Sequence, residues 1–158
     1  MPIAARLESY LNENQIPFSH STHPLAFTAQ EVAHAERVSG RMIAKTVVVL
    51  ADGNFLMAVL AADSLVDLQE LRHALGSAHV RLATERELAD LFPDCELGAM
   101  PPLGNLYSLP VWVDNSLAQQ RTIAFNGGTH RDMVHMTFAD FERAVKPVLI
   151  GFGRRIAA

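Results

Sequence analysis

The chain has 158 residues, a formal net charge of −4 and an isoelectric point near 5.9. Its 49% hydrophobic and 19% charged residues lie outside the composition of disordered chains and can supply a closed apolar core. An acidic chain is not expected to coat nucleic acid, because that binding depends on many contacts between cations and phosphates. The length, with no linker-like stretch, predicts one domain over residues 1–158.

The sequence shows no pattern typical of secretion, membrane insertion or disulfide formation. The start of the chain lacks the apolar run of a secretory signal, and no segment reaches the roughly 20 apolar residues that a spanning helix needs. The single cysteine, Cys95, cannot form an intrachain disulfide and cannot build a thiolate metal site by itself. These features predict a soluble cytoplasmic protein without a membrane partner.

The first third of the chain predicts two helices around an extended segment. Apolar residues at helical spacing indicate a helix that ends near Asn14, and residues 17–23 are expected to be extended. Thr28 and Glu31 then form a capping box, in which each side chain satisfies a free backbone donor. The second helix is therefore expected over residues 29–37.

The middle of the chain predicts a hairpin and a helix. Residues 43–50 are nearly all apolar and rich in valine, which suits a strand buried on both faces. Asp52-Gly53 indicates a tight turn, after which residues 55–62 return antiparallel. Leucines at helical spacing then predict a helix over 65–75.

The last part predicts further short elements that complete a mixed α+β domain with a mostly antiparallel sheet. In chain order they are a strand at 80–82, a helix capped by Thr84, a stiff loop at 98–105, strands at 111–113 and 122–125, a tight loop at 126–130, a strand at 133–136, a helix capped by Thr137 and an edge strand at 148–150.

Lys45 is the first residue with an interesting placement. The chain has only two lysines, and this one lies at the mouth of its most apolar strand. An ammonium there must reach water or a partner, because burying it unpaired is costly. It is either a strand-end lysine that extends to water, or a cation held over a cleft.

The loop Gly98-Ala-Met-Pro-Pro102 is the second candidate for a functional role. Its prolines restrict the backbone, and its glycine allows close approach. Such a loop can direct backbone amides at one small target, an oxyanion or a water. The alternative is a purely structural turn.

The seven histidines do not predict a metal site. His20 and His23 lie in an extended segment, where residues three apart point to opposite faces, and no carboxylate flanks them or the pair His130 and His135 in sequence. No H-E-x-x-H motif is present. His130, next to Arg131 in a Gly-Gly-Thr-His loop, is the candidate functional histidine, the alternative being an ordinary surface histidine.

The usual signatures of covalent or nucleotide-driven chemistry are missing. There is no G-x-S-x-G elbow, and the acidic sequence around Cys95 is expected to raise the pKa of its thiol. No Walker loop and no G-x-G-x-x-G after a strand is found. We therefore expect neither a nucleophilic triad nor a cofactor.

Four segments, taken in order, resemble the YbaK/prolyl-tRNA synthetase-associated editing domain family over nearly the whole chain. They are Phe27-Thr-Ala-Gln-Glu31, Ala44-Lys-Thr-Val-Val-Val49, Gly98-Ala-Met-Pro-Pro102 and Phe125-Asn-Gly-Gly-Thr-His130. The resemblance implies a barrel-like mixed sheet flanked by helices. It also implies a metal-independent deacylase of tRNA that carries a non-cognate amino acid, using the tRNA's terminal hydroxyl and a positioned water.

The resemblance also implies site residues. Lys45, Gly98 and His130 match the family's lysine, its G-x-x-x-P loop and a histidine near the terminal ribose, and are the expected catalytic residues. The expected substrate pocket consists of Phe27, Met42, Thr46, Ala99, Met100, Pro101, Pro102 and Gly128. The expected tRNA contacts are Arg37, Arg41 and Arg131.

The identity of the substrate is the most detailed of these expectations. Thr46 stands where some alanine-editing relatives carry asparagine, and one methylene is worth only about 1–3 kcal/mol in a pocket. We expect a small amino acid such as alanine on proline tRNA, with a synthetase as a further partner in trans and no DNA. Two other functions stay open: a non-catalytic module that binds the acceptor end or a synthetase, and a Schiff-base enzyme that uses Lys45.

Overall fold

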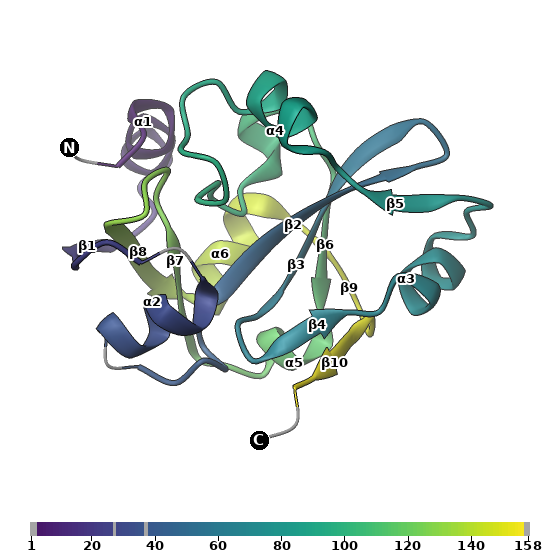
Figure 1. Ribbon diagram of the computed structural model, residues 1–158. Coiled ribbons are helices and arrows are strands. Elements are labelled where there is room, and N and C mark those ends of the chain that lie inside the picture. Colours follow the sequence, from purple (N-terminus) through teal and green to yellow (C-terminus); the bar gives the residue numbers. More distant parts are fainter. Residues whose placement is uncertain (1–2, 27, 37, 157–158) are drawn as a thin grey trace.

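The computed structural model describes residues 3–26, 28–36 and 38–156 (Figure 1). The helices are α1 (Ala5–Glu13), α2 (Ala29–Glu36), α3 (Leu68–Leu75), α4 (Glu85–Leu91), α5 (Asn115–Ala118) and α6 (Phe138–Val145), with a 3-10 turn at Gly104–Leu106. The strands are β1 (Ser19–Thr22), β2 (Ala44–Ala51), β3 (Asn54–Ala61), β4 (Ser64–Val66), β5 (Val80–Leu82), β6 (Val111–Asp114), β7 (Thr122–Asn126), β8 (Asp132–Thr137), β9 (Val148–Ile150) and β10 (Gly153–Arg155).

The predicted hairpin is confirmed as an antiparallel pair of eight residues, β2 and β3. Its turn residues Asp52 and Gly53 have φ of +47° and +88°. Two successive left-handed residues are what a two-residue turn of type I′ requires. From Leu56 to Ala61 every residue of β3 is buried, which explains its continuous apolar sequence.

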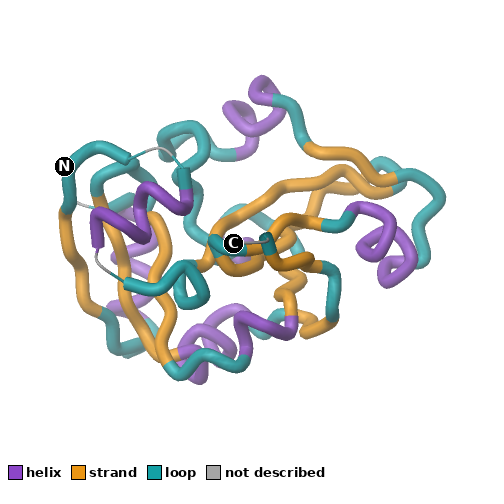
Figure 2. Tube along the Cα trace, turned by 60° about the horizontal axis from the view of Figure 1, so that its bottom comes forward, coloured by secondary structure: helices purple, strands orange, loops and turns teal. Residues whose placement is uncertain are grey.

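Three sheets surround this hairpin. The largest has the order β5-β2-β3-β6-β9, the second is β1-β8-β7, and β10 pairs with β4. Only the β3–β6 and β6–β9 pairs among them are parallel, so the mostly antiparallel α+β fold is confirmed. A parallel bridge between Ile43 and Ala124 joins the start of β2 to β7. The three-stranded sheet lies at one end of the molecule and the β2–β3 turn at the other (Figures 1 and 2).

The two faces of the hairpin contribute to different cores, because successive strand residues point to opposite sides. Val59 belongs to the larger core, together with Phe125 of β7 and Phe141 of α6. Leu60 belongs to the core that α3 covers with Leu71. The hairpin is therefore an internal wall that is buried on both sides over most of its length.

The predicted helix starts are confirmed by their hydrogen bonds. The backbone amides of Thr28 and Glu31 each donate to the other's side chain at 3.0 Å at the start of α2. Thr84 and Glu87 do the same at α4, and the hydroxyl of Thr137 accepts from the third residue of α6. These caps form between residues three apart, so the local sequence is sufficient to set them.

The helix predicted from residue 65 was wrong at its start. Leu65 lies in β4, and α3 begins only after Asp67, whose carboxylate accepts hydrogen bonds from the amides of Gln69 and Glu70 at 3.1 Å. The elements β10, α5 and the 3-10 turn at Gly104–Leu106, which begins in the loop at 98–105, were not predicted. Among the described residues, no helix is long and apolar enough to cross a membrane.

A buried carboxylate fixes the C-terminal segment. Asp114, which is 5% exposed, accepts hydrogen bonds from the amides of Phe152 and Gly153 at 2.8 and 2.7 Å. Burial raises the pKa of Asp114, but hydrogen bonds from Ser116, Phe152 and Gly153 outweigh it, so this pKa lies below its ordinary value. The ionised form therefore stabilises the fold.

We expect Asp114→Asn to lower the free energy of unfolding at pH 7 by about 1–3 kcal/mol, because buried amides lose a charged acceptor. The folded pKa lies below the ordinary value of 3.8, so the stabilisation is present above that pH and is lost as the pH falls toward the lowered pKa. Urea unfolding at pH 7 and at about pH 3 tests this, with the exposed Asp90→Asn as control. An equal loss at both pH values would contradict it.

Candidate active site

The loop that begins at Gly98 and the loop that contains His130 are held together by backbone hydrogen bonds. The amide of Glu96 donates to the carbonyl of Gly128 at 2.7 Å, and the amide of Gly128 donates to the carbonyl of Ala99 at 3.0 Å. Gly128 has φ of +106°, and a Cβ there would lie 3.0 Å from the Cβ of Ala4. Both its backbone angle and the lack of space favour glycine.

His130 is buried and held in one orientation. Its backbone amide donates to the carboxylate of Glu96 at 2.7 Å, and its Nε2 lies 2.6 Å from the carbonyl oxygen of Leu97. Because a carbonyl only accepts, Nε2 carries a hydrogen, and in the neutral ring the lone pair is on Nδ1. The ring also packs on the Gly98 loop, where a Cβ would lie 3.4 Å from Cε1. The sequence did not single out Glu96 for this role.

A hollow of about 430 Å³ opens beside the His130 loop. Its lining residues are Thr22, His23, Pro24, Glu96, Thr129, Arg131 and Asp132. Asp132 is almost fully buried and accepts hydrogen bonds from Nε2 of His20 at 2.7 Å and from the hydroxyl of Thr129. The hollow therefore combines a fixed buried carboxylate with the exposed guanidinium of Arg131, and it suits a polar ligand.

Lys45 is the second residue of β2, and its side chain is half-buried. It makes no hydrogen bond or ion pair within the part of the chain that the structure describes. Burial lowers the pKa of the Lys45 ammonium from its ordinary value of 10.5, and the carboxylate of Asp63 opposes this shift. The next residue, Thr46, lies on the opposite face of the strand, and its buried hydroxyl has no hydrogen-bond partner among the described residues.

The strand that carries Lys45 is bonded to the strand that leads into the His130 loop. Besides the bridge from Ile43, the amide of Ala124 donates to the carbonyl of Met42 at 2.9 Å, which ties the segment before β2 to β7. β7 ends at Asn126 and leads directly into the His130 loop. The fold thus places the lysine strand beside the strand that supports the histidine.

The expected pocket residues are spread over several places. Ala99, Met100, Pro101 and Pro102 are buried, and Met100 packs in the larger core. Met42 lines a separate hollow of about 580 Å³ on the three-stranded sheet. Phe27 lies outside the described residues. The buried side chains of residues 99–102 thus fix the course of the loop that starts at Gly98.

The expected tRNA-contacting arginines differ in their surroundings. Arg41 forms an ion pair with Asp63, with 3.3 Å between Nη1 and Oδ2. Arg131 is exposed at the rim of the 430 Å³ hollow. Arg37 lies outside the described residues. Arg131 is therefore the freer of the two described guanidiniums.

The fold brings carboxylates to histidines that had none in sequence, which corrects the sequence analysis. Asp132 contacts His20 at 2.7 Å, and Glu36 lies 3.2 Å from His135 and 3.9 Å from His23. Glu36 comes from the end of α2, and its two histidines come from β8 and from the segment after β1, so no sequence spacing could reveal these contacts. Within the described ranges, no three histidine, cysteine or acidic side chains form a group that could hold a metal ion.

Cys95 is a poor nucleophile, as the sequence predicted, but the main cause differs. Burial raises the pKa of its thiol to about 11; Asp94 raises it further, and the hydrogen bond with Tyr107 opposes this. The sequence analysis considered only the acidic neighbours. The thiol stays protonated near neutral pH, and only the thiolate attacks readily.

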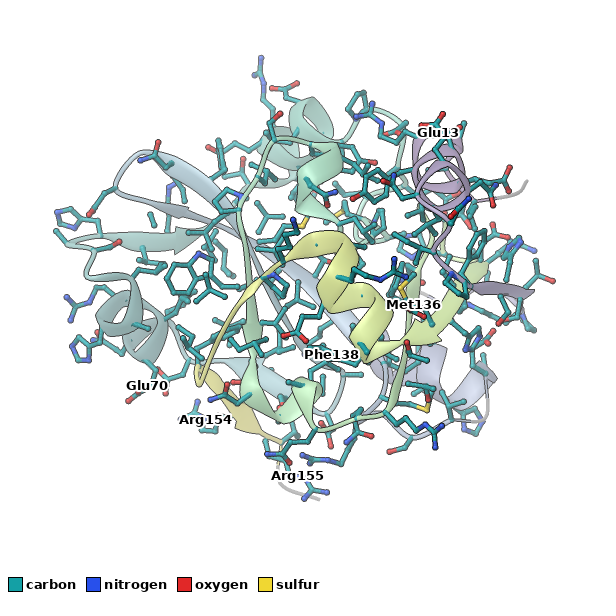
Figure 3. All side chains as sticks on the ribbon, turned by 180° about the vertical axis from the view of Figure 1, so that it is seen from behind. Glu13, Glu70, Met136, Phe138, Arg154 and Arg155 are labelled. Carbon is teal, nitrogen blue, oxygen red and sulfur yellow. The ribbon has the colours of Figure 1, made fainter. Side chains whose placement is uncertain are left out.

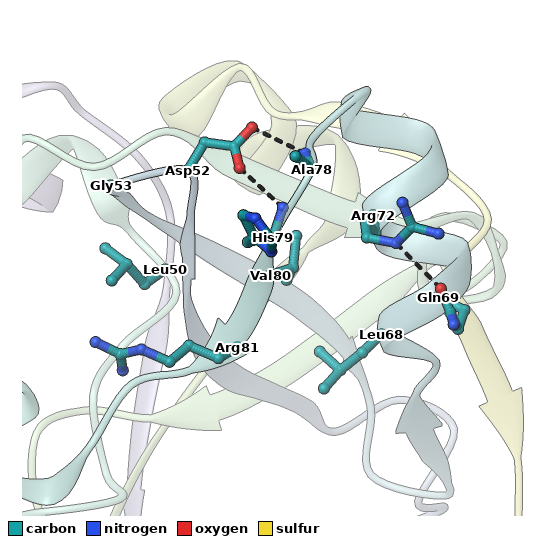
Figure 4. Close-up of a pocket in the computed structure, with 10 residues that line it drawn as sticks. All are labelled: Leu50, Asp52, Gly53, Leu68, Gln69, Arg72, Ala78, His79, Val80 and Arg81. Carbon is teal, nitrogen blue, oxygen red and sulfur yellow. Dashed lines mark hydrogen bonds between the residues drawn. The ribbon is translucent and has the colours of Figure 1, made fainter.

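A larger hollow, of about 740 Å³, lies away from these residues, between the β2–β3 turn, α3 and β5 (Figure 4). Its arginines are already engaged: Arg81 pairs with Glu87 at 2.8 Å, and Arg72 donates to Gln69 at 3.1 Å. None of the expected site residues lines it. Volume alone therefore does not locate the site.

We expect Gly98→Ala to change the surroundings of the His130 ring, because the new Cβ would strain a backbone with φ of +85° and lie 3.4 Å from Cε1 of the imidazole. Gly53→Ala is the matched control, since Gly53 has φ of +88° and nothing within 4 Å of the added Cβ. Both changes should lower the free energy of unfolding by about 1 kcal/mol. Only Gly98→Ala should shift the NMR signals of the His130 ring. Equal shifts in the two variants would contradict the contact.

The family model described as the aminoacyl-tRNA editing domain matches residues 23–144. The chain is 30% identical over 154 residues to the multifunctional Ser/Thr-tRNA deacylase ProXp-y of Escherichia coli, with 94% of this chain and 92% of the relative covered. It is 26% identical over 122 residues to the proline–tRNA ligase of Heliobacterium modesticaldum, which covers 77% of this chain but 21% of the ligase.

The fold has a close counterpart among solved structures. A protein described as a candidate trans-editing enzyme for prolyl-tRNA synthetase superimposes with a TM-score of 0.86 at 22% identity, with 98% of each chain covered. This likeness shows the fold, and the family match spans most of the chain, including β2, the Gly98 loop and the His130 loop. The chain belongs to the aminoacyl-tRNA editing domain family.

Proposed function

We propose that this editing domain acts in trans as a deacylase that hydrolyses the ester of a tRNA charged with a small, non-cognate amino acid. The family match over residues 23–144 is the observation that carries the proposal. The E. coli relative, named as a deacylase, is covered over 92% of its length, which supports action outside a synthetase. The partner is the acceptor end of the mischarged tRNA.

The chemistry we propose uses positioning rather than an enzyme nucleophile. An aminoacyl ester is already reactive, so orientation of a water and stabilisation of the developing oxyanion can supply most of the acceleration. The tRNA's own terminal hydroxyl would assist, and no metal is required. The protonated thiol of Cys95 agrees with this scheme, because the described residues offer no activated thiolate.

Three residues carry the proposed roles. The backbone of Gly98, in its loop buried from residue 99 onward, would orient the ester or the water. His130, held by Glu96 and Leu97, would lie near the terminal ribose. Lys45 would hold the substrate through the substrate's carbonyl or terminal phosphate, because its half-buried ammonium has no hydrogen-bond partner among the described residues and is available for a ligand.

The second part of the proposal concerns which amino acid is removed from the tRNA. A small residue on proline tRNA, alanine first, follows from the motifs and from the similarity to proline–tRNA ligases. Serine or threonine is the competing choice, and the name of the E. coli relative favours it. A pocket that binds a hydroxyl rejects an analogue without it much more strongly than a steric pocket rejects one methylene. Relative rates on alanine and serine therefore distinguish the two.

We expect Lys45→Ala to lower deacylation by about 10²–10³-fold, the usual loss when a preorganised charge contact is removed. Lys146→Ala is the matched control, because Lys146 is the other lysine and is exposed at the end of α6. The assay follows loss of alanine, cysteine, serine, threonine and proline from charged tRNAs, with and without a chelator.

A Lys45→Ala variant with more than half of the wild-type activity would contradict the role of the lysine. Loss of activity with a chelator would contradict the metal-independent scheme. Binding of charged tRNA without hydrolysis of any member would favour a non-catalytic binding module. Trapping of a substrate on Lys45 by borohydride would instead indicate Schiff-base chemistry.

A further inference from the structure

Asp63 lies near the start of β2, where the segment that leads into this strand meets the C-terminal segment. It follows β3 in the turn to β4, and the preceding amide, of Ala62, donates to the carbonyls of Gly40 and Ile43 at 3.0 and 2.9 Å. Its own carbonyl accepts from the amide of Ile156 at 2.7 Å. The residue is thus fixed by the segment that leads into β2 and by the C-terminal segment.

The carboxylate of Asp63 is shared by two guanidiniums. Oδ2 lies 3.3 Å from Nη1 of Arg41 and 3.6 Å from Nε of Arg155. The side chain of Asp63 is 23% exposed and that of Arg41 31%, whereas that of Arg155 is 70% exposed. Arg155 extends from β10 at the surface (Figure 3), so its ion pair with Asp63 is weaker than that of Arg41.

Lys45 is the third cation near this carboxylate. Among the described residues, Asp63 is the one charged group whose field acts noticeably on the Lys45 ammonium. The antiparallel register pairs Lys45 with Leu60, three residues before Asp63, so the long lysine side chain starts on the part of the hairpin that leads to the carboxylate. Asp63 therefore forms ion pairs with two arginines and acts on Lys45 as a nearby charge at the start of β2.

We propose that Asp63 is a positioning residue for Lys45: its carboxylate keeps the half-buried ammonium charged, and Arg41 and Arg155 limit how much of that negative charge reaches the lysine. The inference rests on the proposed function, because it assigns a task to the lysine of the same site. Asp63 itself need not touch the substrate.

This arrangement predicts opposite effects for two substitutions. Asp63→Asn removes the carboxylate, so burial acts on Lys45 without opposition and its pKa falls further. Arg155→Gln removes a guanidinium that competes for Asp63, so the pKa of Lys45 rises. A general loosening of the fold would not give shifts of opposite sign.

The two lysines make the measurement simple. In protein labelled with [¹³Cε]lysine, Lys45 and Lys146 give the only two side-chain signals, and Lys146→Arg assigns them. The expected result is that the Lys45 signal titrates at lower pH in Asp63→Asn, at higher pH in Arg155→Gln and near the wild-type pH in Asp63→Glu. The Lys146 signal should not move in any variant.

A Lys45 midpoint that does not fall in a folded Asp63→Asn protein would overturn the inference. So would a shift of the same sign in Asp63→Asn and Arg155→Gln. Fold is checked by the amide NMR spectrum, and the exposed Asp90→Asn serves as the control for loss of a carboxylate.

Deacylation then tests the link to the reaction. In Asp63→Asn the alkaline limb of the kcat/KM profile should move to lower pH, by the same amount as the Lys45 titration moves. An unchanged profile alongside a moved Lys45 titration would overturn the positioning role. If wild-type protein deacylates no charged tRNA, the proposed function fails, whereas the titration still decides whether Asp63 controls Lys45.

Discussion

The antiparallel hairpin of β2 and β3 is the constraint on which the rest of the molecule depends. Its turn fixes the register over eight residue pairs, and because the strand period is two, a slip of one residue would move Lys45 to the face of Thr46. β5 adds to one side and β6 with β9 to the other, while the start of β2 is bonded to β7. One hairpin therefore separates the two cores and sets the position of the lysine.

The second organising feature is the pair of loops at residues 96–99 and 126–130. Glycine at Gly98 and Gly128 permits left-handed backbone and close approach, and the hydrogen bonds between the loops fix the imidazole of His130. Ester hydrolysis by an editing domain needs oriented groups more than a strong nucleophile. A rigid histidine, a constrained amide loop and a half-buried cation are the parts that the proposed reaction would use.

Local charge differs from the charge of the whole chain. The protein is acidic, with a net charge of −4, but Arg41 and Arg155 both pair with the carboxylate of Asp63, and the start of β2 nearby carries Lys45. Arg131 lies separately at the rim of the hollow beside His130. A few grouped cations are enough to contact one end of an RNA, and they do not require a basic protein. The proposed partner is therefore compatible with a composition that disfavours coating of nucleic acid.

The sequence alone determined the features that depend on residues close together along the chain. The capping boxes at Thr28 and Thr84, the Asp52-Gly53 turn and the valine-rich strand each follow from local hydrogen bonding or side-chain period, and the ordered motifs gave the family. Tertiary structure decided the rest. Leu65 lies in a strand because β4 pairs with β10, the pKa of the Cys95 thiol is raised mainly by burial, and Glu96 reaches His130 only because two loops pack together. Asp63 likewise meets Arg155 across the fold. These contacts join distant segments, and neither spacing nor propensity encodes which distant groups the buried cores bring within reach.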